Sequence, residues 1–411
     1  MTDAYLLGGV RTPFGKYGGA LSHIRLDDLL GKTMVAACEH TGVPLDQVGD
    51  IAAGCVNPAH EGMGDVARWA ALAAGFPDSV PAVTVNRFCA SSLTATIMIS
   101  NSIKADELSL GLAGGAESMS RSGWAFMKGE SAFSPRGPLF ILDTMWAGAG
   151  GPPHPALLAS GAYIEMINTA QNVADRYDLS REEIDDFAFR SHTHAAAARD
   201  SGRFALEIHP VEIPATRKTP AVVIENDEII RSDTTLEALA ALPPQPGTTQ
   251  MTAGNSSPLT DGASAVLVAS RAAADSLGIP VMAKVVASAT HALDPKIMGI
   301  APAFAMAKAL KLAGLKPEQI DLWEVHEAFS AQALGVLREL TTQLDGFEVP
   351  DDKLNPNGGA VAIGHPFGAS GTRYVLTLAT ELRLRGARYG ILGVCVGSGQ
   401  GVALILENIA T

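Results

Sequence analysis

Four residues combine chemical reactivity with small neighbours that would let a substrate approach the backbone: Cys89, His326, His365 and Cys395. Cys89 follows the β-branched run at 83–85 and precedes apolar residues at helical spacing. A thiol at such a strand-to-helix turn faces unpaired N–H groups and the positive end of the helix dipole, which favour the thiolate. The pattern predicts that Cys89 is a nucleophile, against the ordinary alternative of a small buried cysteine.

The other three residues fit the needs of a thiol nucleophile. His365 stands in a Gly-His-Pro turn, which would hold a base on rigid backbone. Cys395 ends an apolar strand ahead of glycines whose N–H groups can face a developing oxyanion. A second thiol could carry the proton that a carbon nucleophile must lose and regain. Each residue alone is more often structural, so the prediction depends on their occurring together in a duplicated fold.

The elements that must position these residues occur twice. A helix over 26–41 ends at Gly42 and leads through a short acidic loop to an apolar strand, and the same order recurs around Gly314, 272 residues later. The first copy continues to Cys89 and the second to His365, each at the turn before a helix. Two α/β units packed face to face would bring these turns together.

Between the copies the composition changes. The stretch from 121 is rich in Gly, Pro and aromatic residues, as in long functional loops. Helices are predicted over 167–177 and from Ser180, where Ser180 and Glu183 resemble a capping box. We therefore divide the chain into an N-terminal half over 1–120 plus 252–272, a loop domain over 121–251 and a C-terminal half over 273–411.

Composition excludes several classes of protein. The 411 residues are 47% hydrophobic with a net charge of -13, which argues against a nucleic-acid binder. Four dispersed cysteines predict neither a disulfide framework nor a zinc site. His326 begins His-Glu-Ala-Phe-Ser, which lacks the second histidine of a metalloprotease helix. Without a signal-peptide pattern or a run of ~18 apolar residues, we expect a cytoplasmic enzyme with no membrane span and no metal.

Taken together, these residues resemble the thiolase family, the acyl-CoA:acetyl-CoA C-acyltransferases, over nearly the whole chain. The resemblance lies in N-R-x-C-x-S-S at 86–92, G-G-A-E-S-M-S at 114–120, T-A-G-N-S-S with D-G-A at 252–263, E-A-F at 327–329, N-x-x-G-G-A-x-A-x-G-H-P-x-G-x-S-G at 355–371 and C-x-G-x-G-x-G at 395–401. It implies an α/β fold of two duplicated halves, packed as a five-layer α-β-α-β-α sandwich with the loop domain inserted.

The resemblance also implies a role for each residue. Cys89 would carry the acyl group as a thioester, His365 would activate that thiol, and Cys395 would exchange a proton with acetyl-CoA. The N–H groups of Cys89 and Gly397 would form one oxyanion hole. His365 and His326 would form the other, which would hold the thioester enolate.

Substrate contacts and partners follow from the same resemblance. Ser257 would contact the pantetheine arm of CoA, while Arg217 is a candidate for a phosphate contact with an ordinary solvated arginine as the alternative. CoA would be a substrate, and no cofactor is implied. A homodimer or homotetramer is expected, and a hydratase–dehydrogenase subunit is a possible partner.

Three features depart from the family pattern. His326 replaces the usual Asn before Glu-Ala-Phe, as in thiolases of fatty-acid oxidation complexes, and Ser398 stands where a glycine is more usual. The loop over 124–166, which usually shapes the acyl pocket, follows no family pattern. Acyl chain length is therefore not predicted.

The predicted function is reversible thiolytic cleavage of a 3-oxoacyl-CoA by CoA, as in fatty-acid β-oxidation, because N-R-F-C-A-S-S resembles degradative members. Biosynthetic acetoacetyl-CoA formation is the alternative within the family. A ketosynthase is disfavoured by Cys395, since decarboxylation needs no second thiol base. A scaffold subunit whose chemistry has lapsed is disfavoured because both cysteines and both histidines are kept.

Overall fold

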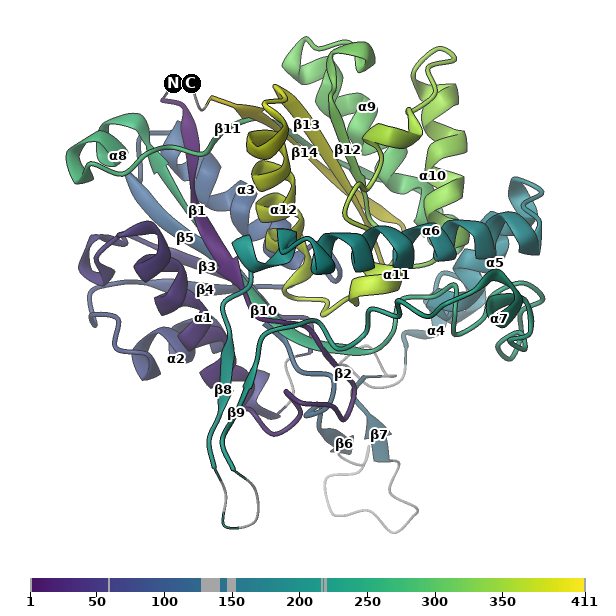
Figure 1. Ribbon diagram of the computed structural model, residues 1–411, viewed down its shortest axis with the longest axis horizontal. Helices are drawn as coiled ribbons and strands as arrows, with labels where there is room; N and C mark the ends of the chain where they lie inside the picture. The colour runs from purple at the N-terminus through teal and green to yellow at the C-terminus, as the bar shows by residue number, and fades with distance from the viewer. Residues whose placement is uncertain are drawn as a thin grey trace.

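The computed structural model describes residues 2–57, 60–126, 141–145, 153–215, 217 and 220–409. A long mixed sheet runs through the molecule (Figure 1). Its strands follow the order β12 (Leu322–Val325), β13 (Tyr389–Val396), β14 (Gln400–Asn408), β11 (Ala283–Ala292), β1 (Ala4–Arg11), β10 (Thr260–Ser270), β5 (Leu110–Glu117), β3 (Ile51–Gly54) and β4 (Ala82–Val85). Two residue pairs join β1 to β11, so two half-sheets meet at this point.

The two half-sheets have the same topology. In the first, β1 and β5 flank β10 antiparallel, and β3 lies parallel to both β5 and β4. In the second, β11 and β13 flank β14 antiparallel, and β13 lies parallel to β12. Leu354 forms a parallel bridge with Trp323 of β12, at the place that β4 takes in the first half. The predicted duplication is therefore present in the order and direction of the strands.

Helices form three layers around the half-sheets. The helices α1 (Leu26–Thr41) and α2 (Val66–Ala73) pack on the outer face of the first, whereas α9 (Ala301–Ala313) and α10 (Ser330–Gln343) cover the outer face of the second. The helices α3 (Ser91–Lys104) and α12 (Ser370–Arg385) share one apolar core between the half-sheets. The fold is the predicted five-layer α-β-α-β-α arrangement.

Local sequence signals end and begin these helices as predicted. Gly42 and Gly314 close α1 and α9 in the left-handed conformation, with φ of 77° and 66°. Short 3₁₀ turns follow at Leu45–Gln47 and Pro317–Gln319, which preserves the separation of 272 residues. The helix α6 (Arg181–Asp200) begins with the complete capping box of Ser180 and Glu183.

The segment between the halves contributes smaller elements. These are β6 (Trp124–Phe126), β7 (Ile141–Asp143), α4 (Pro155–Ser160), α5 (Met166–Arg176), α6, the hairpin β8 (Val211–Ile213) and β9 (Val222–Ile224), and α7 (Leu236–Ala240). The elements β2 (Gly15–Lys16), α8 (Arg271–Leu277) and α11 (Ala360–Ile363) complete the chain. Part of the acyl-pocket loop over 124–166 lies outside the described residues. The helix α6 lies against α11 of the C-terminal half (Figure 1), and the backbone of Arg11 in β1 bonds to Glu207 and His209, so this segment lies beside both halves.

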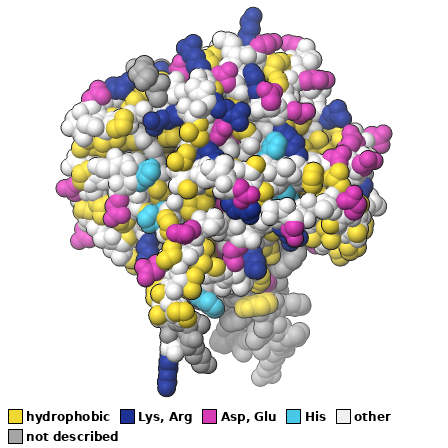
Figure 2. All heavy atoms as spheres, viewed as in Figure 1, with side chains coloured by type: hydrophobic (Ala, Val, Ile, Leu, Met, Phe, Trp, Pro, Cys, Tyr) yellow, Lys and Arg dark blue, Asp and Glu magenta, His cyan; other side chains and the backbone are white. Residues whose placement is uncertain are grey.

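The composition argues against a nucleic-acid binder and against a membrane span, and the surface and the helices can be compared with both expectations. Basic and acidic side chains are interspersed on the face shown in Figure 2, and they do not gather into one basic field there. In the part of the chain that the structure describes, no helix is long and apolar enough to cross a membrane.

Candidate active site

Cys89 lies on a tight turn between β4 and α3. Phe88 is held with φ of 45°, a conformation that non-glycine residues rarely adopt. The Asn86 carboxamide fixes this turn, since its oxygen accepts the Phe88 N–H at 3.0 Å and its nitrogen donates to the Val56 carbonyl at 3.0 Å. Ser91 accepts the Arg87 N–H at 2.9 Å. The nucleophile candidate is therefore aimed by a strained and well-bonded turn.

Two N–H groups act on the Cys89 sulphur. Those of Gly397 and of Cys89 itself hydrogen-bond to Sγ and lower its pKa, but burial has the larger effect and raises the pKa to about 12. The backbone groups act in the predicted direction, but desolvation of the sulphur outweighs them, so the thiol needs a base before it can attack. The N–H pair predicted for one oxyanion hole does meet at this atom.

His365 and His326 lie side by side. Their ring centroids are 4.3 Å apart, and both side chains are buried. His365 donates its backbone N–H to the Thr260 hydroxyl at 3.1 Å, and its Nδ1 lies 2.6 Å from the Ser370 hydroxyl. His326 Nδ1 lies 3.0 Å from the Tyr374 hydroxyl. Both Nε2 atoms are buried without a hydrogen-bond partner among the described residues.

Both imidazoles are neutral. Burial, and to a lesser degree the nearby Arg373 guanidinium, lower the pKa of His365 to about 3. Burial likewise lowers the pKa of His326 well below its ordinary value, and His365 and Arg373 add to this. A neutral imidazole can act as a base or as a hydrogen-bond donor, depending on which nitrogen carries the proton.

Cys395 lies in β13, beside the Cys89 thiol. Burial raises the pKa of the Cys395 thiol well above its ordinary value, the charge of Cys89 adds to this, and the N–H of Ala328 acts in the opposite direction. Ala328 belongs to the turn that begins with His326, so both thiols and both histidines occupy one place. The structure thus brings together Cys89, His326, His365, Cys395 and Gly397.

Glycines allow the two halves to approach at this place. A methyl group on Gly115 would lie 2.0 Å from the Gly368 carbonyl oxygen, and one on Gly54 would lie 2.6 Å from the same atom. A methyl group on Gly371, in α12, would lie 2.2 Å from the Leu93 nitrogen of α3. The turns that carry Cys89 and His365 can meet because side chains are absent here.

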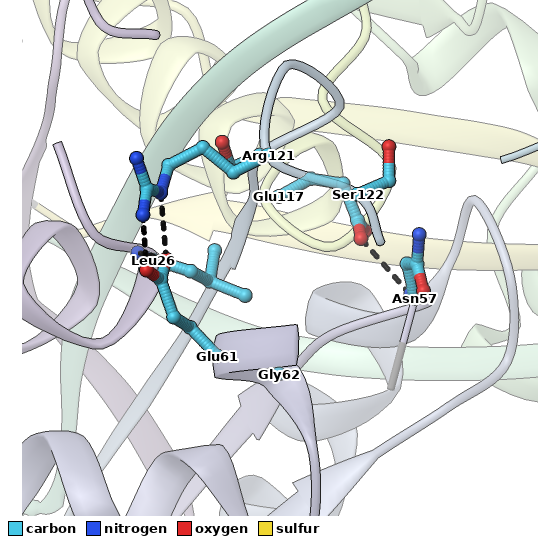
Figure 3. Close-up of a pocket in the computed structure, with 8 residues that line it drawn as sticks. Leu26, Asn57, Glu61, Gly62, Glu117, Arg121 and Ser122 are labelled. Atoms are coloured by element: carbon cyan, nitrogen blue, oxygen red, sulfur yellow. Dashed lines mark hydrogen bonds and ion pairs between the residues drawn. The ribbon is translucent and has the colours of Figure 1, made fainter. Parts of the chain in front are cut away.

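Glu117 ties the halves together beneath the site. Its carboxylate accepts the N–H groups of Val56 and Asn57 at 3.0 Å each and that of Gly368 at 2.8 Å. Figure 3 shows Glu117 bonded to Asn57 beside a small cavity, with the Arg121–Glu61 ion pair on its other wall. Burial raises the pKa of Glu117 to about 7.

Glu327, next to His326, likewise accepts hydrogen bonds from distant segments. Its carboxylate accepts from the Ser191 hydroxyl at 2.6 Å and from the Asn355 carboxamide at 2.7 Å. Asn355 also exchanges two hydrogen bonds with the backbone of Val325, at 2.8 and 2.9 Å. These contacts join α6, β12 and the loop before α11, and they fix the backbone that carries His326.

Ser257 and Arg217, the two predicted CoA contacts, lie in different places relative to the four reactive residues. Ser257 is half-buried, and its N–H donates to the Ala328 carbonyl at 2.9 Å, so it lies beside the site. Arg217 is exposed between β8 and β9, and none of the hydrogen bonds or ion pairs found within the described ranges joins it to the four reactive residues. Ser398 has φ of 63°, which accounts for the preference for glycine there.

Four supporting residues were not predicted, namely Glu117, Glu327, Ser370 and Tyr374. The first three lie inside the family motifs, and for the two carboxylates an acidic residue at or just after the end of an apolar strand was the available signal. Ser370 begins α12, the helix that follows the Gly-His-Pro turn, and Tyr374 lies one turn later. In the described ranges, no group of three or more His, Cys, Asp or Glu could hold a metal ion.

Comparisons with known proteins agree with this fold. Residues 4–272 match the family described as "Thiolase, N-terminal domain", and residues 279–408 match "Thiolase, C-terminal domain". The chain therefore belongs to the thiolase family of acyltransferases, which use CoA as a substrate.

Individual relatives cover the full chain. It is 44% identical to a beta-ketoadipyl-CoA thiolase of Acinetobacter baylyi, over 100% of both chains. It is 39% identical to an acetyl-CoA acetyltransferase of Cupriavidus necator, over 99% of this chain and 100% of the relative. The crystal structure of human mitochondrial 3-ketoacyl-CoA thiolase superimposes with a TM-score of 0.90 at 35% identity, covering 100% of this chain and 99% of that one.

Proposed function

We propose that this chain catalyses the reversible thiolytic cleavage of a 3-oxoacyl-CoA by CoA, through an acyl group carried on Cys89. The observation that supports this most strongly is the convergence of two N–H groups on the Cys89 sulphur, beside the Cys395 thiol. Such a pair of donors can hold the oxyanion that forms when a thiolate adds to a carbonyl.

In the first half-reaction, His365 Nε2 takes the proton of the Cys89 thiol. The thiolate adds to the C3 carbonyl, and the N–H groups of Cys89 and Gly397 stabilise the resulting oxyanion. The C2–C3 bond then breaks, which leaves a thioester on Cys89 and the enolate of acetyl-CoA. His365 and His326 donate to the enolate oxygen, and Cys395 gives its proton to C2.

In the second half-reaction, the Cys395 thiolate takes the proton of an incoming CoA thiol. The CoA thiolate attacks the thioester, and the same pair of N–H groups holds the oxyanion. Cys89 leaves as a thiolate and regains its proton from His365. The products are acetyl-CoA and an acyl-CoA shortened by two carbons.

The CoA and acyl contacts are part of the proposal. We infer that Ser257 contacts the pantetheine arm and that the inserted segment over 121–251 covers the CoA. Arg217, exposed between β8 and β9, is proposed as a contact to a phosphate of CoA. The beta-ketoadipyl-CoA relative supports a substrate whose acyl chain ends in a second carboxylate, rather than a fatty acyl chain.

A homo-oligomer is also inferred. The strand β4 lies at one end of the sheet order. Trp69 of α2 is 61% exposed, and Val83 of β4 and Met98 of α3 are 40% and 41% exposed. An open strand edge flanked by exposed apolar side chains is suited to a second copy of the chain. The His326 motif still suggests a hydratase–dehydrogenase partner, which co-purification would test.

The test is loss of the ultraviolet absorbance of a magnesium-bound 3-oxoacyl-CoA when CoA is added. Wild type and Cys89→Ala are compared over straight-chain substrates and 3-oxoadipyl-CoA. We expect wild type to cleave the dicarboxylic substrate best, and Cys89→Ala to cleave none. Cleavage by Cys89→Ala would contradict the proposal, whereas preference for acetoacetyl-CoA would favour the acetyltransferase function named for the Cupriavidus necator relative.

A further inference from the structure

Tyr374 contacts His326, one of the two histidines that face the enolate in the proposed reaction. It lies in the first turns of α12, is 1% exposed, and places its hydroxyl oxygen 3.0 Å from His326 Nδ1. The two rings meet edge to face, with centroids 5.5 Å apart and an interplanar angle of 85°. The contact therefore fixes both the position and the orientation of the imidazole.

The direction of this hydrogen bond follows from counting protons. Burial raises the pKa of Tyr374, so the phenol keeps its proton. The backbone N–H of Glu327 hydrogen-bonds to the same oxygen, which then serves as an acceptor on that side. His326 is neutral and carries one ring proton. The phenol O–H therefore donates to Nδ1, and the imidazole proton is on Nε2.

His365 has the opposite arrangement. The Ser370 hydroxyl has one proton, which it donates to the Pro366 carbonyl at 2.9 Å. At 2.6 Å from His365 Nδ1, this hydroxyl must then accept, so the proton of His365 is on Nδ1 and its Nε2 has a free lone pair. Two neighbouring histidines thus present different groups: His365 an acceptor and His326 a donor.

The geometry points to Tyr374 as a positioning residue that holds His326 in its Nε2–H form and so makes it a donor to the thioester enolate. This inference rests on the proposed function. His326 Nε2 is buried and has no partner among the described residues, as expected for a donor that waits for substrate. Without the phenol, the proton of His326 can move to Nδ1, and Nε2 would then repel the enolate oxygen.

The test compares one step that needs the enolate with one that does not. Exchange of the C2 protons of acetyl-CoA with deuterated water requires the enolate. Exchange of labelled CoA into an acyl-CoA requires Cys89 but no enolate. In Tyr374→Phe, which keeps the ring, we expect proton exchange to slow by about tenfold to a hundredfold and CoA exchange to change by less than about threefold.

Tyr177→Phe is the matched control, because it removes a phenol that bonds to Glu339 outside the site. It should slow neither exchange. Equal slowing of both exchanges in Tyr374→Phe, or of neither, would overturn the inference. His326→Ala separates this inference from the proposed function. If it slows proton exchange and Tyr374→Phe does not, only the positioning role fails. If it leaves proton exchange unchanged, the proposed enolate site fails.

Discussion

The two halves of this chain have one topology and carry different chemistry. Across the sheet, Ala116 of β5 pairs with Ala263 of β10, and Cys395 of β13 pairs with Gly401 of β14. These positions correspond, because Ile51 of β3 and Trp323 of β12 lie 272 residues apart and pair with equivalent residues, Leu112 and Ile391. The first position holds a methyl group and is followed by Glu117, whose carboxylate fastens backbone N–H groups, whereas the second holds a thiol at the candidate site.

The comparison extends to the turns before the central helices. The first half contributes Cys89, whereas the second contributes His365 and, after β12, His326. The first half is also interrupted between β5 and β10 by the inserted segment, while β13 and β14 are joined directly by the turn that contains Gly397. The duplicated backbone thus places two turns face to face. One turn carries the nucleophile, and the other side supplies its base and the hydrogen-bond donors.

The largest expected effect comes from removing His365, the base that the second half supplies to the Cys89 thiol. His365→Ala should lower both carbon–carbon cleavage and CoA exchange by about a thousandfold to ten-thousandfold, because burial raises the pKa of Cys89 to about 12 and both steps need its thiolate. Steady-state cleavage and labelled-CoA exchange measure this.

His192→Asn is the control for that variant, since it changes another buried histidine, whose Nδ1 accepts the Arg231 N–H at 3.3 Å. It should keep activity within about threefold, the range of ordinary substitutions away from a site. If His365→Ala retains CoA exchange, His365 is not the base that activates Cys89.

Cys395→Ala should slow carbon–carbon cleavage and largely spare the exchange of CoA. Carbon–carbon cleavage should fall by about a thousandfold, since C2 loses its proton donor. Exchange of CoA should fall by less than about tenfold, because the thiol of free CoA ionises in water to a few per cent at neutral pH. Equal loss in both assays would show that Cys395 supports the fold and not the proton transfer.

Gly371→Ala would force the halves apart where α12 crosses α3. Its methyl group would lie 2.2 Å from the Leu93 nitrogen, so we expect the free energy of unfolding to fall by about 3 kcal/mol. The control is Gly386→Ala, which changes the glycine that ends the same helix. Gly386 has φ of 60°, and a methyl group there would meet nothing within 4 Å, so the free energy of unfolding should fall by about 1 kcal/mol. Urea unfolding measures the free energy of unfolding of both variants. Equal losses would show that α12 and α3 do not cross closely at Gly371.

The last effect, which vanishes at low pH, concerns Glu324 of β12, which corresponds to Ala52 of β3. Burial raises the pKa of Glu324 to about 8 from its ordinary 4.5. Between these values the unfolded chain releases the proton and the folded chain retains it, so this residue makes the free energy of unfolding fall as pH rises.

Glu324→Gln removes that dependence. The variant should match wild type near pH 5 and exceed its free energy of unfolding by an amount on the order of 3 kcal/mol near pH 9. Denaturant titrations at both pH values test this. A difference that does not change with pH would contradict a raised pKa at Glu324.

Local signals in the sequence predicted much of the fold. The helix over 26–41 has the predicted bounds, and Gly42 and Gly314 both end helices in the left-handed conformation. The capping box at Ser180 is formed. These features depend on neighbours within a few residues, so spacing and residue type suffice to predict them.

The site was predicted less completely, because part of it depends on contacts between distant segments. Nothing near Glu117 indicates that it accepts the N–H of Gly368, 251 residues away. Tyr374 is an ordinary aromatic in an apolar helix until His326 is placed beside it. The net shift in the pKa of Cys89 could not be predicted from the sequence, since the backbone dipole can be inferred from a helix start, whereas burial of the sulphur depends on the second half.

In the proposed reaction, Cys89 of the first half carries the acyl group, and His365 of the second half activates the Cys89 thiol. Wild type and Cys395→Ala should be mixed with an acyl-CoA, quenched in acid, digested and analysed by mass spectrometry. We expect the acyl mass on the peptide that contains Cys89 in both proteins, and its absence in Cys89→Ala. An acyl group on the peptide that contains Cys395, or one that persists in Cys89→Ala, would contradict the account.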